Sequence, residues 1–135
     1  MLVKTMGLTA DFSGNFDDID NGTYYYREIG IARKLGITAG VGNSRFEPDS
    51  PISRQGMMVM TAKALNNMKK INLNIDSTNL DKFGDKAQIS PYAVPGLSAM
   101  VEAGLIEGRG KGISPLSYTN RTEAAVMLYK LYNFK

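Results

Sequence analysis

The same spaced set of residues occurs twice in this chain, and this repeat constrains the fold more than any other feature. The ten shared positions are Phe16, Asp18, Tyr24, Gly36, Gly40, Gly42, Pro48, Arg54, Met60 and Lys63 in the first copy, and Phe83, Asp85, Tyr92, Gly104, Gly108, Gly110, Pro115, Arg121, Met127 and Lys130 in the second. The copies are 67 residues apart at both ends of the unit (16 to 83, 63 to 130) and 68 apart in its middle (24 to 92). Chance similarity does not keep ten positions in register through compensating shifts, so the sequence predicts a repeat architecture.

A third, partial copy opens the chain, because Met1 and Lys4 align with Met60 and Lys63. We therefore divide the sequence into the C-terminal end of a truncated repeat (1–15), a complete repeat (16–67), a connector (68–82) and a second complete repeat (83–135). The first residues are expected to be the last turns of a helix. We expect the chain to be a fragment of a larger protein.

Each complete repeat is predicted to be a helix, a glycine-rich loop and a second helix. Apolar residues at helical spacing predict first helices over residues 24–35 and 91–103, with Ser90 as the cap of the latter. Gly36 and Gly104 follow these helices and fit left-handed C-terminal positions. Ser53 or Asn120, or the residue before each, is expected to cap the second helix. The fold class is therefore mainly α.

Composition excludes several classes of function. The 135 residues contain neither Cys nor His, which removes disulfides, thiol chemistry and the commonest general base and metal ligand. The net charge of +3 is mild, and Lys and Arg do not cluster along one helix face, so no nucleic-acid partner is expected. No apolar run reaches the roughly 18 residues of a membrane span. We expect no enzyme activity, catalytic residue, cofactor or metal.

Carboxylates suggest two alternatives that the sequence does not favour. Asp18 and Asp85 precede predicted helices without a hydrolase motif around them, so they are expected to cap turns. The stretch from Asp17 to Glu28 approximates a calcium loop, but Ile19 occupies the third ligand position. Neither alternative predicts catalysis or metal binding.

The candidate ligand-binding residues recur in both repeats: Arg54, Arg121, Tyr24, Tyr92, Gly40, Gly42, Gly108 and Gly110. Each arginine stands at the start of a predicted helix, where a cation opposes the helix dipole and therefore needs a partner. That partner is either an internal carboxylate, such as Asp18 or Asp85, or an anionic ligand. The tyrosines are either half-buried core residues or flat faces for a sugar. The glycines either form tight turns or let a ligand approach backbone N–H groups.

The repeat resembles the S-layer homology domain. The resemblance rests on Phe16-Asp-Asp18, Tyr24, Gly36-Ile37, Gly40, Phe46-x-Pro48 and Ile52-Ser-Arg54, and on Phe83-Gly-Asp85, Tyr92, Gly104-Leu105, Gly108, Pro115 and Thr119-Asn-Arg121-Thr-Glu123. It implies tandem helix–loop–helix repeats, usually three, packed in a pseudo-threefold arrangement around a central helical bundle. It also implies grooves between repeats that bind secondary cell wall polymers, often through a pyruvylated sugar.

Carried onto this chain, the resemblance places the ligand-binding arginine at Arg54 and Arg121, the groove glycines at Gly40 and Gly108, and the aromatic residue at Tyr24 and Tyr92. The chain departs from the family pattern at three points. Gly56 replaces the glutamate that the second repeat keeps as Glu123, Ile113 replaces the loop phenylalanine, and neither repeat has the usual tryptophan.

We therefore expect noncovalent attachment of a secreted or surface protein to the wall of a Gram-positive-type bacterium. The expected partners are an anionic wall glycan and a neighbouring repeat, in the parent chain or in a second copy. The expected location is extracellular, in the cell wall or S-layer. The alternative is a surface assembly module that binds proteins and no glycan. The parent protein could also be a secreted polysaccharide hydrolase that uses this segment as its anchor.

Overall fold

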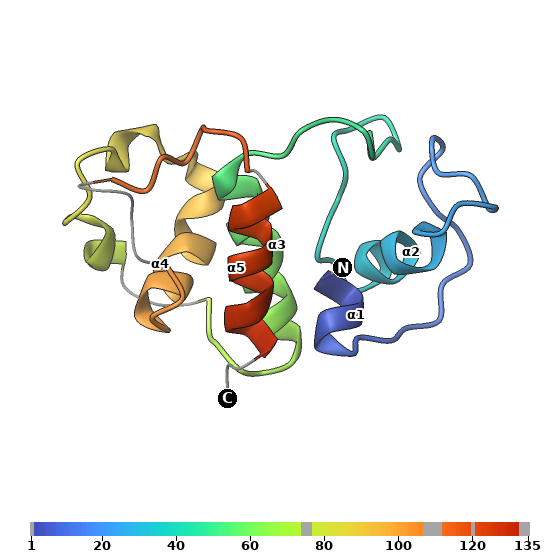
Figure 1. Ribbon diagram of the computed structural model, residues 1–135, viewed down its shortest axis with the longest axis horizontal. Helices are drawn as coiled ribbons and strands as arrows, with labels where there is room; N and C mark the ends of the chain where they lie inside the picture. The colour runs from blue at the N-terminus through green and yellow to red at the C-terminus, as the bar shows by residue number, and fades with distance from the viewer. Residues whose placement is uncertain (1, 74–76, 107–111, 120, 133–135) are drawn as a thin grey trace. The chain divides into compact units, whose positions relative to one another are not determined.

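A computed structural model describes residues 2–73, 77–106, 112–119 and 121–132 of the chain, which is mainly helical (Figure 1). Within these residues there is no strand, and only isolated bridges join Gly42 to Arg45 and Ser53 to Tyr118. The chain forms two compact units, Met1–Ser50 and Pro51–Lys135. The predicted helical fold class is confirmed, whereas the pseudo-threefold arrangement stays a prediction.

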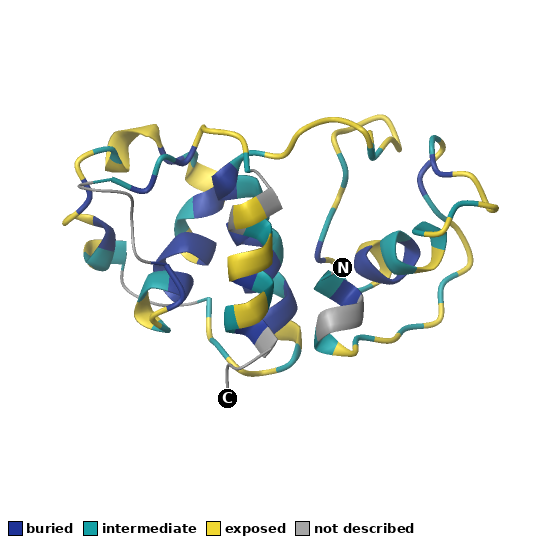
Figure 2. Ribbon diagram, viewed as in Figure 1, coloured by how far each residue is buried: buried dark blue, intermediate teal, exposed yellow. Residues whose placement is uncertain are grey.

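The first unit contains α1 (Leu2–Met6) and α2 (Tyr26–Lys34), which pack against each other. The expected helical start of the chain is thus present as α1. The core of the first unit is apolar and contains residues from both helices and from the loops: Val3, Phe16, Ile19, Ile31, Ala32 and Ile37. These buried positions appear dark blue in Figure 2.

The second unit is built on three helices, α3 (Arg54–Asn67), α4 (Val94–Glu102) and α5 (Arg121–Tyr132). Short 3₁₀ turns precede α4: η1 (Ser77–Leu80), η2 (Lys86–Gln88) and η3 (Pro91–Ala93). Helix α4 packs against α3 and η1. The α3–α4 contact is close because α4 has Gly96, where an added Cβ would lie 3.4 Å from Val59 Cα and Ala62 Cβ. The second helix of the first repeat thus belongs to the core of the second unit.

The predicted helix ends are confirmed where local chemistry decides them. Ser53 caps α3 by accepting a hydrogen bond from the backbone N–H of Gly56 at 3.1 Å. Gly36 and Gly104 both have φ of +75°, which is the left-handed region that glycine tolerates best. The following residue in each case, Ile37 or Leu105, donates back into the last helical turn at 2.9 Å. Both first helices therefore end in the same glycine motif.

Two expectations about local structure are met only in part. Ser90 stands at the expected N-cap position with Pro91 after it, but it caps a 3₁₀ turn, and its side chain makes no capping bond and instead accepts from Gln55 Nε2 at 2.9 Å. The connector also contains structure that its polar sequence did not indicate. Leu80 of η1 is completely buried, and Asn79 Nδ2 donates to the carbonyl oxygen of Ser98 in α4 at 2.9 Å. The buried leucine and the Asn79 hydrogen bond thus both hold this turn against α4.

Candidate functional site

In each repeat an aspartate accepts the same pair of backbone hydrogen bonds from the loop that leads from the first helix to the second. In the second repeat, Asp85 Oδ1 accepts from Ile113 N at 2.9 Å and Oδ2 accepts from Ser114 N at 2.7 Å. Ser114 has φ of +56°, an uncommon value for a residue other than glycine. The two charge-assisted bonds thus stabilise a strained backbone. Gly112 permits this approach, because an added Cβ would lie 2.7 Å from Asp85 Oδ2.

The first repeat has the same arrangement at the equivalent residues. Asp18 Oδ1 accepts from Phe46 N at 2.8 Å and Oδ2 from Glu47 N at 2.7 Å, and Glu47 has φ of +57°. The Arg45 guanidinium lies 3.9 Å from Asp18 Oδ2. Both aspartates thus accept hydrogen bonds from backbone amides, but of a loop 28 and 29 residues along the chain. The expected local capping is wrong for Asp85, whose side chain makes no capping bond at η2.

These hydrogen bonds shift the ionisation of both carboxyl groups. The Phe46 amide, and then the Glu47 amide, lower the pKa of Asp18. Desolvation raises the pKa of Asp85, but the amides of Ile113 and Ser114 and the charge of Arg54 together outweigh it, so its pKa is also lowered. Both aspartates are thus held in the charged form that the loops need.

Arg54 lies against the same loop that Asp85 holds. Its Nε donates to the carbonyl oxygen of Ile113 at 2.8 Å, and its backbone N–H donates to Ser117 O at 2.7 Å. The residue is only 9% exposed. Desolvation lowers the pKa of the guanidinium, and the charge of Asp85 opposes that shift. Two kinds of partner were expected for Arg54, an internal carboxylate or an anionic ligand. The structure shows an internal partner: the Ile113 carbonyl accepts its hydrogen bond, and Asp85 interacts with its charge.

The residue after Arg54 takes part in a contact that sequence reasoning missed. Gln55 is 4% exposed, and its side-chain amide pairs with Ser90 in both directions, accepting from Ser90 N at 3.0 Å and donating to Ser90 Oγ at 2.9 Å. This pair fixes the start of α3 next to the chain that leads to Tyr92. A glutamine in an otherwise apolar helical stripe was the available signal.

The tyrosines at the repeated aromatic position lie on the surface. Tyr24 is 90% exposed and Tyr92 is 62% exposed, so the interpretation of these residues as half-buried core is wrong. Tyr24 makes an edge contact with Tyr25, with ring centroids 5.0 Å apart. An exposed aromatic ring with a polar rim at the same register of two repeats is suited to contact with a ligand.

The structure describes two of the four candidate glycines. Gly40 has φ of +74°, and an added Cβ would lie 2.3 Å from the carbonyl oxygen of Arg45, so this position needs glycine for space as well as for φ. Gly42 has φ of +105° and no atom within 4 Å of an added Cβ. Gly108 and Gly110 lie outside the described residues, and so does the side chain of Arg121, whose backbone begins α5.

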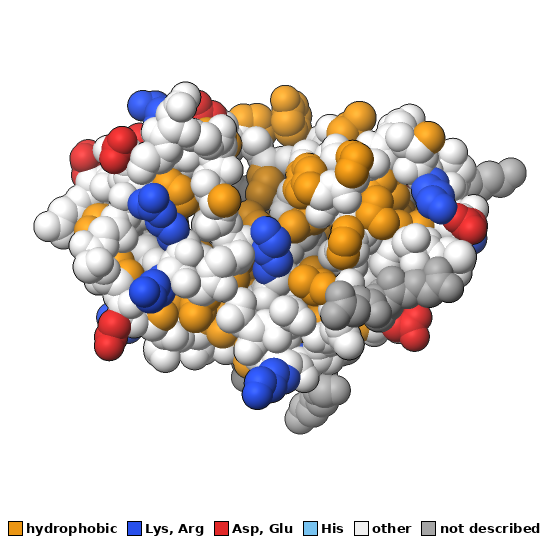
Figure 3. Space-filling view, turned by 180° about the vertical axis from the view of Figure 1, so that it is seen from behind, with side chains coloured by type: hydrophobic (Ala, Val, Ile, Leu, Met, Phe, Trp, Pro, Cys, Tyr) orange, Lys and Arg blue, Asp and Glu red, His pale blue; other side chains and the backbone are white. Residues whose placement is uncertain are grey.

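The candidate residues divide between the two units. Tyr24, Gly40 and Gly42 belong to the first unit, and Arg54, Tyr92 and Arg121 belong to the second. On the face of the molecule in Figure 3, the Lys and Arg side chains lie apart from one another, separated by uncharged surface. None of the helices in the described part of the chain combines the length and apolarity that crossing a membrane requires.

Comparison with known sequences decides the family. The family model of the S-layer homology domain matches residues 15–56 and 82–125, which together cover most of the chain. The chain belongs to the S-layer homology domain family. The matched segments start beside Phe16 and Phe83, the first residues of the repeat pattern, so the family confirms the repeat and its period. S-layer homology domains occur in cell-surface proteins and associate with cell wall components.

The relatives of this S-layer homology chain carry different names. It is 29% identical to an exoglucanase XynX of Acetivibrio thermocellus and 29% identical to an amylopullulanase of Thermoanaerobacterium thermosulfurigenes, in each case over 97% of the chain. It is 26% identical, over 98% of the chain, to an S-layer protein of Bacillus thuringiensis subsp. finitimus. The matches cover only 12%, 7% and 15% of these relatives.

Proposed function

We propose that this chain anchors a surface protein to the bacterial cell wall without a covalent bond, by binding an anionic secondary cell wall polymer. One observation carries the proposal. Nearly the whole chain matches a small part of proteins named as an exoglucanase, an amylopullulanase and an S-layer protein. Because these names share no single activity, the common segment is expected to supply attachment and not catalysis. The parent protein is proposed to lie outside the cell, on the wall.

Chemically, the proposal uses the residues that both repeats present. An arginine fork suits a carboxylate such as that of a pyruvyl ketal. Further donors would be backbone N–H groups of the glycine-rich loops other than those of Gly40 and Val41, which donate to Thr38 Oγ1 and to the Arg45 carbonyl oxygen. The high exposure of Tyr24 and Tyr92 supports a role for their rings against a sugar face. The loops held by Asp18 and Asp85 provide rigid edges, which reduce the entropy lost on binding.

A protein–protein assembly module is the second candidate, and two observations favour it. Arg54 contacts the neighbouring repeat through Ile113, which is a structural role. Helix α5 also has an exposed apolar side, on which Val126 is 50% and Tyr129 is 72% exposed. Exposed apolar surface of this kind often marks a contact with another protein.

Sedimentation with purified Gram-positive walls separates the two functions. We expect the chain to sediment with native walls and to remain in solution with walls stripped of their pyruvyl groups. Retention on stripped walls would contradict recognition of the ketal carboxylate. Failure to bind either wall, together with self-association in light scattering, would support the assembly module instead.

A further inference from the structure

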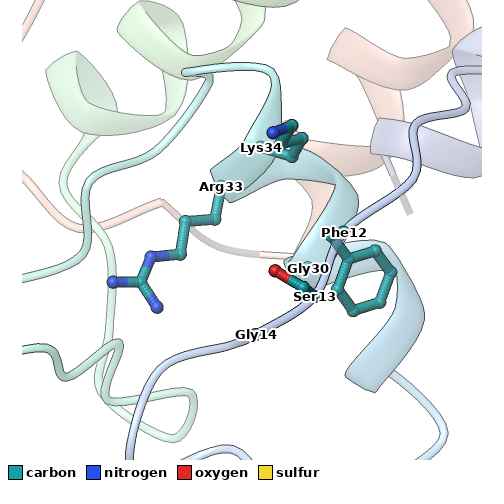
Figure 4. Close-up of a pocket in the computed structure, with 6 residues that line it drawn as sticks. All are labelled: Phe12, Ser13, Gly14, Gly30, Arg33 and Lys34. Carbon is teal, nitrogen blue, oxygen red and sulfur yellow. The ribbon is translucent and has the colours of Figure 1, made fainter.

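The first unit has a hollow that the proposed function does not use. It measures about 420 Å³ and is lined by six residues: Phe12, Ser13, Gly14, Gly30, Arg33 and Lys34 (Figure 4). Two of these residues pack closely, because a Cβ added at Gly30 would lie 2.3 Å from the Phe12 ring. The lining therefore combines an aromatic ring, a hydroxyl and two cations, and contains no carboxylate.

The two cations have no anionic partner of their own within the described residues. Arg33 and Lys34 are both exposed, and neither forms an ion pair there. The Arg33 guanidinium lies 4.4 Å from the centroid of the buried Phe16 ring, a cation–π contact that restrains its position. In Figure 4 the Ser13 hydroxyl is turned toward the side on which the Arg33 side chain extends, whereas Lys34 leaves α2 in another direction. Arg33 and Ser13 are thus two hydrogen-bond donors on the same side of the hollow in this view, and Lys34 adds charge nearby.

The residues at the corresponding spacing before and in the second repeat differ from those that line this hollow. With the spacing of 67 residues, Ser13 corresponds to Leu80 (13 + 67), which is completely buried against α4. With the mid-repeat spacing of 68, Gly30 corresponds to Ser98 (30 + 68), which is also completely buried. At equal distances before Phe16 and Phe83, the chain thus carries an exposed serine beside the hollow and a completely buried leucine in the connector.

The charge of the hollow is likewise particular to the first repeat. At the same spacing of 68, Arg33 corresponds to Val101 and Lys34 to Glu102. Cations at the end of a helix interact favourably with its dipole, but the second repeat ends the equivalent helix α4 at Glu102, without a cation in its last turn. The two cations that line the hollow are thus missing at the equivalent residues of the second repeat.

We propose that this hollow binds an anionic group carried on a sugar ring, with Arg33 and Ser13 as donors to the anion and Phe12 as the apolar contact for the ring. Identification of the natural ligand as the wall polymer rests on the proposed function, but the preference for an anionic sugar does not. If the hollow binds the polymer in addition to the sites proposed at Arg54 and Arg121, one polymer chain can be bound at more than one point, which raises avidity.

The test follows the backbone amides of Gly14 and Gly30 by NMR during titration with glucuronic acid, glucose 6-phosphate and neutral glucose. Glucuronic acid reports binding of a carboxylate and glucose 6-phosphate binding of a phosphate. We expect at least one charged sugar to shift both amides saturably and glucose to shift neither. Arg33→Gln should weaken the charged sugar about threefold to fivefold, the range of an exposed charge contact.

Two variants of the chain make the test specific. Arg27→Gln removes the same charge from an exposed position of the same helix that does not line the hollow, and it should leave the affinity within about twofold. Ser13→Leu introduces the residue that stands at the same distance before Phe83, and it should abolish the shifts while the helical circular dichroism is retained. Equal shifts with glucose, or unchanged affinity in both Arg33→Gln and Ser13→Leu, would overturn the site.

The outcomes also separate this site from the proposed function. Saturable shifts with a charged sugar in a chain that does not sediment with walls would support the hollow and contradict wall attachment. Sedimentation with walls in a chain whose Gly14 and Gly30 amides do not respond to either charged sugar would support attachment and overturn the hollow.

Discussion

The guanidinium of Arg54 donates from Nε to the carbonyl oxygen of Ile113, 2.8 Å away, across 59 positions of sequence. The N–H of the same Ile113 is held by Asp85. One loop residue of the second repeat is thus bound on its acceptor side by a helix of the first repeat and on its donor side by a carboxylate of its own repeat. This arrangement couples the two repeats through the start of α3.

Replacement of Arg54 should destabilise the second unit even without a ligand. In Arg54→Ala the Ile113 carbonyl loses its charged donor inside a largely buried site, which costs about 2 kcal/mol. Arg54→Lys should recover little of this, because an ammonium cannot reproduce a donor at the Nε position. Urea unfolding measures the difference, with Arg27→Lys as the exposed control. An unchanged unfolding midpoint in Arg54→Ala would mean that the bond contributes no net stability.

Replacement of Asp85 should change the dependence of stability on pH. A carboxyl group whose pKa is lowered by folding stabilises the fold above its unfolded pKa, and this contribution is lost as the pH falls below about 4. Asp85→Asn keeps one acceptor but turns an amide NH₂ toward a backbone N–H. We expect a loss of about 1 kcal/mol at pH 7, a value reduced for partial solvent exposure.

The same variant should show a weaker loss of stability between pH 4 and pH 2 than the parent chain. Asp81→Asn is the matched control, because Asp81 is exposed and pairs only with the Lys86 side chain among the described contacts. If both variants keep the acid sensitivity of the parent, then Asp85 does not contribute to it.

Alanine substitutions at Gly40 and Gly42 distinguish the free-energy cost of a positive φ from the cost of steric crowding. In Gly42→Ala the new side chain meets no other atom, but the residue has to adopt a positive φ, which destabilises the fold by about 1–2 kcal/mol. Gly40→Ala adds to this a Cβ 2.3 Å from the Arg45 carbonyl oxygen, and overpacking of this kind costs a further 1–3 kcal/mol or so. Thermal unfolding should therefore rank Gly40→Ala well below Gly42→Ala. Equal melting temperatures would show that the loop relaxes around the new methyl group.

Arg121 is the register partner of Arg54 and the start of α5, and it stays a predicted ligand residue. Arg121→Ala should weaken binding to native walls about 30- to 150-fold, the equivalent of 2–3 kcal/mol for a charge-assisted pair. Arg121→Lys should restore little of the affinity. Sedimentation at several wall concentrations gives the ratio, and wall binding equal to that of the parent would exclude Arg121 from the site.

Binding to native walls should survive a rise from about 0.05 to 0.5 M salt with less than about a tenfold loss. The net charge of +3 gives weak long-range attraction, whereas a carboxylate held by an arginine and backbone N–H groups is screened much less. Titration of bound protein against salt measures this. Complete release at 0.5 M would indicate loose ionic attraction, contrary to the proposed recognition of one group.

The sequence alone determined the features that depend on neighbouring residues. The repeat and its spacing, the mainly helical fold class, the Ser53 cap and the terminal glycines Gly36 and Gly104 were all predictable. These features depend on local preferences of backbone and side chains, so a few neighbouring residues are enough to predict each of them. The resemblance to the family rests on the combination of motifs in both repeats, which is specific even though each motif alone is weak, and the family model confirms it.

Tertiary structure decided the contacts that join distant residues. The acceptor of Arg54, the pairing of Gln55 with Ser90 and the exposure of Tyr24 depend on which surfaces meet, and periodicity carries no information on that. The hollow of the first repeat is the clearest case. Ser13 and Leu80 stand at the same distance before Phe16 and Phe83, but only the tertiary structure shows that the serine is exposed beside a hollow and that the leucine is buried.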